Sequence, residues 1–135
     1  MAYNAKDIEN WCEAEWDRWK ADCSGFAKAV CAHAGARLQG QANHLLDFFE
    51  ASSEWESMGP DPEAACAMAS GGWLIIGGLK QRPNGHVVVV VKSPPLRHPV
   101  AYWGRLGAVG RKRSGVNWSW NHTDLALVKY YGYKL

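Results

Sequence analysis

The chain has 135 residues, of which 47% are hydrophobic and 21% charged, and its formal net charge is +2. This length suffices for one domain with its own hydrophobic core, so neither a metal nor disulfides are needed to explain folding. The weak net charge argues against nucleic acid as a partner, because phosphate backbones are bound by strongly basic surfaces. We expect a single domain over residues 1–135, a monomer.

No stretch has the length and hydrophobicity of a membrane span. The longest apolar run, around Val87 to Val91, is interrupted by Lys92 and by Pro94-Pro95. The first ten residues lack the apolar core of a secretion signal. We therefore expect synthesis in the cytosol, and any export would need a specialised machine.

The first half of the chain predicts helices. Residues 5–20 carry apolar side chains at loose helical spacing, and a second helix is predicted from Asp22, a good N-cap, to about Ala34. Two shorter helices are expected over 42–50 and 62–69. The last of these opens with Asp61 as the cap and Pro62 at the first helical position.

From Gly72 onward the pattern changes to that of strands. Strands are predicted over 73–77, 86–92, 100–103, 115–120 and 127–134, with a turn at 83–85. The run from His86 to Lys92 is apolar enough for burial on both faces of a sheet. The basic run Arg111-Lys112-Arg113 is interpreted as a solvated turn. Helices followed by strands predict the α+β class, with the N-terminal helices packed on an antiparallel β-sheet.

The four cysteines do not form a metal or redox motif, since no CxxC pair occurs. If Cys23 and Cys31 share a helix, a rise of about 1.5 Å per residue puts them about 12 Å apart, too far for a disulfide. A disulfide between Cys12 and Cys66 stays open. The eight tryptophans are interpreted mainly as core residues.

Cys23 is the candidate nucleophile. It lies in the first turn of a predicted helix, where unpaired N–H groups and the helix dipole favour a thiolate. A thiolate attacks carbonyl carbon, and the same N–H groups can stabilise the oxyanion that forms. Gly25, unfavourable within a helix by about 1 kcal/mol, suggests a close approach to the backbone.

His86 is the candidate general base, because it opens the predicted central strand directly after Asn84-Gly85. A histidine there can point from a rigid element toward a helix N-terminus packed on the sheet. His33, His44, His98 and His122 have no comparable position, and no HExxH motif or other metal-ligand spacing is present. We therefore expect no metal and no cofactor.

The segments Asp22-Cys23-Ser24-Gly25-Phe26 and Gly85-His86-Val87-Val88 together resemble the NlpC/P60 family of papain-like cell-wall peptidases. Within it, the similarity is greatest to the peptidoglycan amidase effectors of type VI secretion systems. The matching stretches are 41–43 with 46–47, 72–80, 106–110, 120–124 and 130–133.

This resemblance implies a papain-like core and a cysteine endopeptidase that cuts the γ-D-glutamyl–diaminopimelate bond of the stem peptide. It also implies action in the periplasm of a competing bacterium, delivery by secretion machinery, and a cognate immunity protein that occludes the groove. The polar residue that orients the histidine in this family aligns with Trp103, which cannot accept a hydrogen bond. A backbone carbonyl, Asn117 or Asn121 is an alternative third member.

Asp22, Ser24, Gln41 and Asn43 are the candidate substrate contacts. Two other functions stay open. The first is a wall hydrolase of phage lysis or remodelling, although the signal peptide and wall-binding repeats of remodelling enzymes are missing. The second is a non-catalytic module whose tryptophans stack on glycan, which predicts a buried and unreactive Cys23.

Overall fold

The computed structural model describes residues 3–135. Its helices are α1 (Ala5–Trp19), α2 (Cys23–His33), α3 (Ala42–Ala51), α4 (Pro62–Ser70), the short α5 (His122–Leu125) and the 3-10 turn η1 (Val116–Trp118). Its strands are β1 (Trp55–Gly59), β2 (Leu74–Leu79), β3 (His86–Val90), β4 (Val100–Trp103), β5 (Arg111–Gly115) and β6 (Lys129–Tyr133). The predicted α+β class is confirmed.

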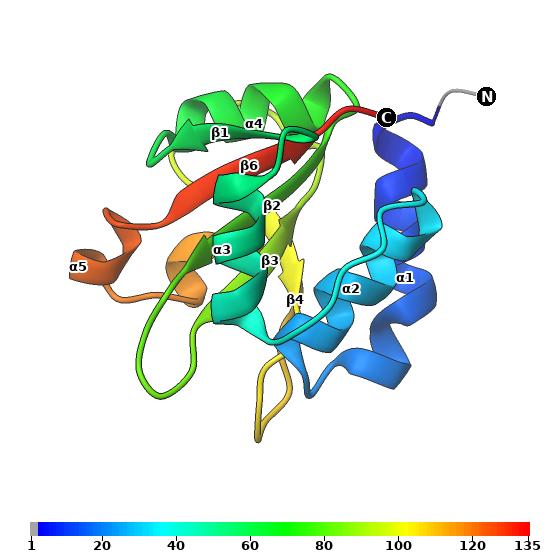
Figure 1. The fold of residues 1–135 in the computed structure, drawn as a ribbon. Helices are drawn as coiled ribbons and strands as arrows, with labels where there is room; N and C mark the ends of the chain where they lie inside the picture. Colours follow the sequence, from blue (N-terminus) through cyan, green and yellow to red (C-terminus); the bar gives the residue numbers. More distant parts are fainter. Residues whose placement is uncertain (1–2) are drawn as a thin grey trace.

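The six strands form one antiparallel sheet in the order β1-β6-β2-β3-β4-β5. Helices α1, α2 and α3 lie toward one face of the sheet, and α4 lies behind it (Figure 1). Strand β3 lies between β2 and β4, so it has a hydrogen-bonded neighbour on each side. His86 is therefore the first residue of an interior strand, as the sequence predicts.

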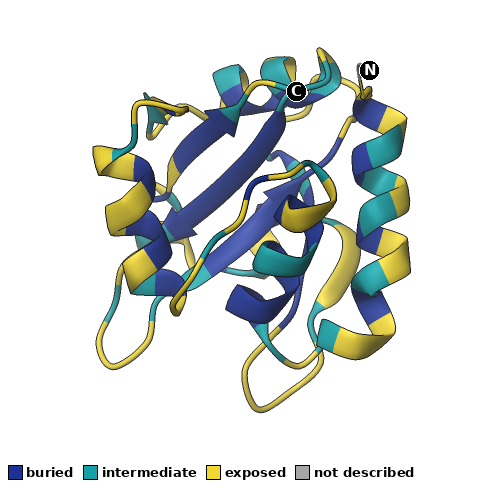
Figure 2. Ribbon diagram, turned by 45° about the vertical axis from the view of Figure 1, so that its right-hand side comes forward, coloured by how far each residue is buried: buried dark blue, intermediate teal, exposed yellow. Residues whose placement is uncertain are grey.

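The core is divided into two layers by the sheet. Along β3 and just beyond it, Val87, Val89 and Val91 join the layer under α1 to α3, while Val88 and Val90 join the layer that contains Trp103 and Trp120. This alternation follows from the two-residue repeat of a strand. In Figure 2 the central strands are buried over most of their length, whereas the helices show buried and exposed stripes.

Two sequence predictions are corrected, and one edge strand was missed. β1 was not predicted. The basic run at 111–113 is part of strand β5, not a turn, and the strand predicted over 115–120 is mostly the 3-10 turn η1. Edge strands pair on one side only and expose most side chains, so β5, with three exposed basic residues, lacks the apolar pattern of a strand.

All four cysteines are free and buried, so the disulfide left open between Cys12 and Cys66 is absent. Cys66 instead lies near the Ser93 hydroxyl. The tryptophans are mainly core residues as predicted, and Trp118 is the one exposed tryptophan of the described chain. No helix among residues 3–135 is long and apolar enough to cross a bilayer.

Candidate active site

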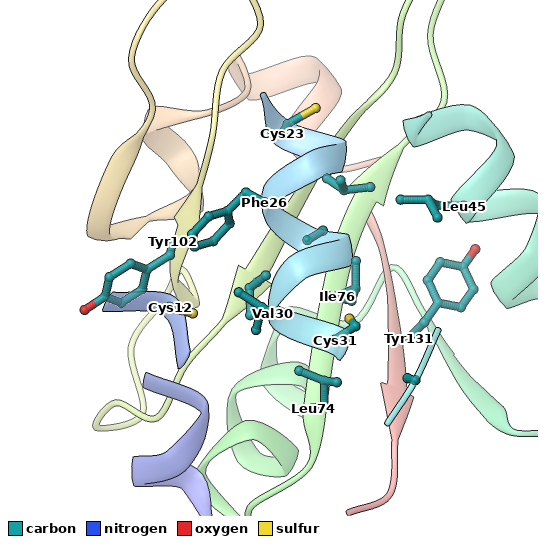
Figure 3. Close-up of a cluster of buried hydrophobic side chains, with 14 of the residues drawn as sticks. Cys12, Cys23, Phe26, Val30, Cys31, Leu45, Leu74, Ile76, Tyr102 and Tyr131 are labelled. Atoms are coloured by element: carbon teal, nitrogen blue, oxygen red, sulfur yellow. The ribbon is translucent and has the colours of Figure 1, made fainter. Parts of the chain in front are cut away.

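Cys23 is the first residue of helix α2, and Asp22 is its N-cap. The Asp22 carboxylate accepts a hydrogen bond from the backbone N–H of Gly25 at 3.0 Å, which fixes the first turn of the helix. Figure 3 shows the Cys23 sulfur directed away from the end of α2, beyond the buried residues that the helix packs against the sheet. The sequence therefore predicts both the cap and the position of the cysteine.

The turn that precedes Cys23 is fixed by the loop that joins β4 to β5. The backbone N–H groups of Arg105 and Gly110 both donate to the carbonyl of Lys20, at 3.1 and 2.8 Å. A Cβ at Gly25 would clash with the ring of Trp19. The close approach that Gly25 suggests is thus an indole ring of the protein itself, which packs on the first turn of α2.

Burial controls the acidity of the Cys23 thiol. The side chain is 7% exposed, and its removal from water raises the pKa above the ordinary value. Backbone N–H groups of Val87, Ser24 and Cys23 act in the opposite direction, and the Asp22 carboxylate raises the pKa further. The expected stabilisation of a thiolate is therefore outweighed by burial, and Cys23 rests as a thiol at neutral pH.

His86 lies against two tryptophans. Its ring centroid is 5.1 Å from that of Trp120 and 6.4 Å from that of Trp103, both in edge-on geometry. Burial, and secondarily the positive charge of Arg105, lowers the pKa of His86 to about 4. The imidazole is therefore neutral at neutral pH and able to accept a proton.

The Nε2 atom of His86 is buried and has no hydrogen-bond partner among residues 3–135. Trp103 does occupy the neighbouring position, as predicted, and contributes no acceptor. Asn121 does not replace it, because its side chain caps α5 by accepting from the N–H of Asp124 at 2.8 Å. Asn117 is exposed, and its carboxamide lies over Gly115. Neither asparagine makes a hydrogen bond to His86 within residues 3–135.

The structure places Cys23 next to the start of β3 without pairing it to His86. The sulfur accepts from the backbone N–H of Val87, a residue whose side chain packs on the α2 side of the sheet. The ring of His86 instead lies with Trp103 and Trp120. Neither side chain is a hydrogen-bond partner of the other within residues 3–135. Catalytic hydrogen bonds are often long in free enzymes and tighten with substrate.

A pocket of about 220 Å³ opens over Cys23. Its walls come from the start of α2, the start of α3, the loop before β3 and the loop after β4. The residues that line it are Asp22, Cys23, Gln41, Ala42, Asn43, His44, Pro83, Asn84, Gly85 and Leu106. Three of the four candidate substrate contacts, Asp22, Gln41 and Asn43, are thereby brought together at the cysteine.

Ser24, the fourth candidate, lies beneath this pocket. It is 1% exposed, and its hydroxyl lies 3.1 Å from the Asp22 carboxylate and 3.0 Å from the side-chain carbonyl of Gln41. A buried hydroxyl with two acceptors at hand is a structural link rather than a surface contact. Ser24 ties the start of α2 to the residue that precedes α3.

Asn43 anchors the loop that leads to His86. Its amide donates to the carbonyl of Gln81 at 2.9 Å, and its side-chain oxygen accepts from the N–H of Gln81 at 3.2 Å. A Cβ at Gly85 would clash with the same oxygen. The Gln81 side chain in turn donates to Asp124 of α5 at 3.0 Å. Gln81 was not predicted, because hydrogen bonds through its backbone leave no pattern in the sequence.

The buried imidazole predicts an acid-sensitive fold. Because folding lowers the pKa of His86 from 6.5 to about 4, the unfolded chain binds a proton more readily in this range. The contribution of His86 to stability is present above pH 6.5 and is lost as the pH falls toward 4, by about 3 kcal/mol at most. Urea unfolding at pH 7 and pH 4 should show a smaller loss for His86→Gln than for the unchanged chain. Equal losses would contradict the buried neutral imidazole.

Within the described residues, no group of three or more histidine, cysteine, aspartate or glutamate side chains is placed to hold a metal ion. The site therefore consists of a helix-start thiol at the floor of a pocket, next to a strand that begins with a neutral histidine. Together with an α+β core in which helices pack against an antiparallel sheet, these features are consistent with a papain-like core.

Comparison with known proteins identifies the relationship within this class. No family model matches the chain. The chain is 38% identical over 141 aligned positions to "Peptidoglycan amidase Tse1" of Pseudomonas aeruginosa, and the alignment covers 95% of this chain and 90% of that protein. The chain belongs to the family of peptidoglycan amidase Tse1. The predicted relationship to peptidoglycan amidases is confirmed, and an amidase is a hydrolase. Membership of the NlpC/P60 family stays a prediction from the sequence motifs.

Proposed function

We propose that this protein is a peptidoglycan amidase that hydrolyses the γ-D-glutamyl–diaminopimelate bond of the stem peptide, with Cys23 as nucleophile and His86 as general base. The observation that carries the proposal is the 38% identity to a peptidoglycan amidase over 95% of the chain. The position of Cys23 supports it, because the one cysteine at a helix start is also the cysteine that lines a pocket among the described residues.

The reaction begins from a neutral pair. As the Cys23 sulfur attacks the carbonyl carbon, His86 accepts the thiol proton, and the N–H groups at the start of α2 stabilise the oxyanion. The imidazolium then protonates the departing amine, which leaves a thioester on Cys23. His86 next takes a proton from water as the water oxygen attacks the thioester carbon. The Cys23 thiolate leaves, the carboxylic acid is released, and the imidazolium returns its proton to the sulfur.

The pocket walls give the substrate its polar contacts. The carboxylate of Asp22 and the side-chain amide of Gln41 lie on either side of the buried Ser24 hydroxyl, and both line the pocket. Leu106 supplies an apolar wall on the opposite loop. Held by Ser24, these groups are preorganised to receive the amide and carboxylate groups of a stem peptide.

Digestion of purified Gram-negative peptidoglycan, followed by mass spectrometry of the released fragments, tests the activity and the bond together. The proposal predicts fragments that end in D-glutamate and others that begin with diaminopimelate. Fragments cut at another amide would refute the assigned bond but would still show that the protein is an amidase. Intact muropeptides after prolonged incubation would refute the amidase.

We further propose that the protein is an antibacterial effector delivered by a type VI secretion system, and that a cognate immunity protein blocks the Cys23 pocket. Both rest on the resemblance of the Cys23 and His86 motifs to such effectors, and the 38% identity to a peptidoglycan amidase supports them. Expression with and without an export signal in a Gram-negative host tests the site of action. Lysis only on export is expected, and Cys23→Ala should prevent it. Equal toxicity in the cytoplasm would contradict action on the wall.

A further inference from the structure

A second and larger cavity, of about 640 Å³, lies outside the Cys23 pocket and shares no lining residue with it. It opens next to η1 and α5, and its walls include His98 before β4, Asn117 of η1 and Tyr130 of β6. A volume between about 300 and 1,000 Å³ is typical of ligand-binding pockets. None of the described residues that line it is a cysteine or serine nucleophile, so it is suited to binding rather than chemistry.

Two polar groups at this cavity lack partners. Tyr130 is 1% exposed, and burial alone raises the pKa of its hydroxyl, with no hydrogen bond from another residue of 3–135. The neighbouring Tyr131, which points to the other face of the sheet, instead donates to Glu50 at 2.6 Å. The ring of Trp120 also lines the cavity, and its Nε1 atom is buried beneath the surface and unpaired within residues 3–135. The Tyr130 hydroxyl has no partner in the described chain and is therefore free to donate to a ligand in the cavity.

The lining of the cavity favours an anionic ligand, because Arg97 is its one formally charged side chain among the described residues. Arg97, His98 and His122 line it, and none of the described lining residues is acidic. The side chains of Trp120 and Tyr130, together with apolar residues of η1 and α5, supply a hydrophobic floor. Hydrogen-bond donors above an aromatic floor match a ligand that combines carboxylates with a partly apolar frame.

We propose that this cavity is a second peptidoglycan site, which binds a carboxylate-bearing stem peptide other than the one being cut. The assignment rests on the proposed function, because the substrate polymer is what presents many stem peptides to one enzyme molecule. Binding a neighbouring peptide raises the effective concentration of the polymer at Cys23. The cavity also shares a wall with the catalytic base, since Trp120 contacts His86 on one side and lines the cavity on the other.

The test uses Cys23→Ala protein, so that the ligand stays intact, and a soluble disaccharide-tetrapeptide muropeptide as the probe. Titration is followed by the NMR signal of the Trp120 indole N–H and by calorimetry. We expect the indole signal to shift as the muropeptide binds. Tyr130→Phe should weaken this binding about tenfold, which is the effect of one lost hydrogen bond to a charged group. Tyr131→Phe is the matched control, because it makes the same change on the next residue but faces α3, and it should leave the affinity unchanged.

Neutral di-N-acetylchitobiose separates sugar from carboxylate recognition, and it is expected not to shift the Trp120 signal. A shift with this sugar equal to that with the muropeptide would overturn the carboxylate assignment. The second site would be refuted if the Trp120 signal did not move at millimolar muropeptide. It would also be refuted if Tyr130→Phe left the affinity for the muropeptide unchanged. Digestion of peptidoglycan by the unmodified chain tests the proposed function separately. Cleavage without a Trp120 shift would refute the second site and leave the amidase assignment standing. A Trp120 shift without cleavage would refute the amidase and leave the second site standing.

Discussion

Replacement of Cys23 by alanine is expected to lower the rate of peptidoglycan hydrolysis by about four orders of magnitude or more. The reason is chemical: without the sulfur no thioester can form, and what remains is the modest catalysis by oxyanion stabilisation and binding. The chain should stay folded with a small loss of stability, because the side chain is buried but lies at the first residue of α2, where it borders the pocket. Fragment release per unit time, together with the circular dichroism spectrum, measures both effects.

Cys31→Ala is the matched control for this variant. Cys31 lies two turns further along α2, is fully buried in the core, and has a thiol pKa that burial raises strongly. Its loss should lower the free energy of unfolding and leave the rate per folded molecule unchanged. If Cys23→Ala keeps measurable turnover, or if Cys31→Ala loses it in a folded protein, the assignment of the nucleophile is wrong.

Replacement of His86 by glutamine is expected to lower the rate by about 10²- to 10⁴-fold, the usual contribution of a general acid–base. The effect is large here because Cys23 rests as a thiol and depends on a base to remove its proton during attack. The pKa of about 4 keeps the imidazole neutral at neutral and mildly acidic pH, so the rate should not fall sharply until the pH approaches that value. A pH–rate profile measures this acidic limb.

His44 supplies the control, because it lines the Cys23 pocket and is exposed. His44→Gln should retain most of the activity. The comparison matters because the ring of His86 lies with Trp103 and Trp120 and makes no hydrogen bond to Cys23 in the free protein. A large loss in His44→Gln with near-normal rates in His86→Gln would transfer the role of base to His44.

Elements with buried faces were predictable from the sequence, and edge elements were not. Helix α2 has a cap at Asp22 and apolar residues at helical spacing, and β3 is a run of valines, so both were predicted within two residues. β1 has a single buried residue, Trp55, and β5 has none. Their backbones are ordered by pairing with β6 and β4, a long-range effect that local hydrophobic patterns do not encode.

The same distinction holds for the site. The positions of Cys23 and His86 follow from element boundaries, which capping and periodicity mark. The protonation state of the pair does not, because it depends on how deeply each group is buried after folding, and burial outweighs the helix start at Cys23. The link between Asn43 and Gln81 uses backbone groups of a loop, and only the folded chain brings the two together.

The most direct test of Cys23 as the nucleophile compares its chemical labelling with the loss of activity. The protein is treated with iodoacetamide for increasing times, the label at each cysteine is located by peptide mass spectrometry, and the residual rate of peptidoglycan hydrolysis is measured on the same samples. Cys12, Cys31 and Cys66 are buried away from the pocket. We predict that the fraction of activity lost equals the fraction of Cys23 labelled, and that labelling accelerates as the pH rises above neutrality. Full labelling of Cys23 with activity retained would contradict the mechanism.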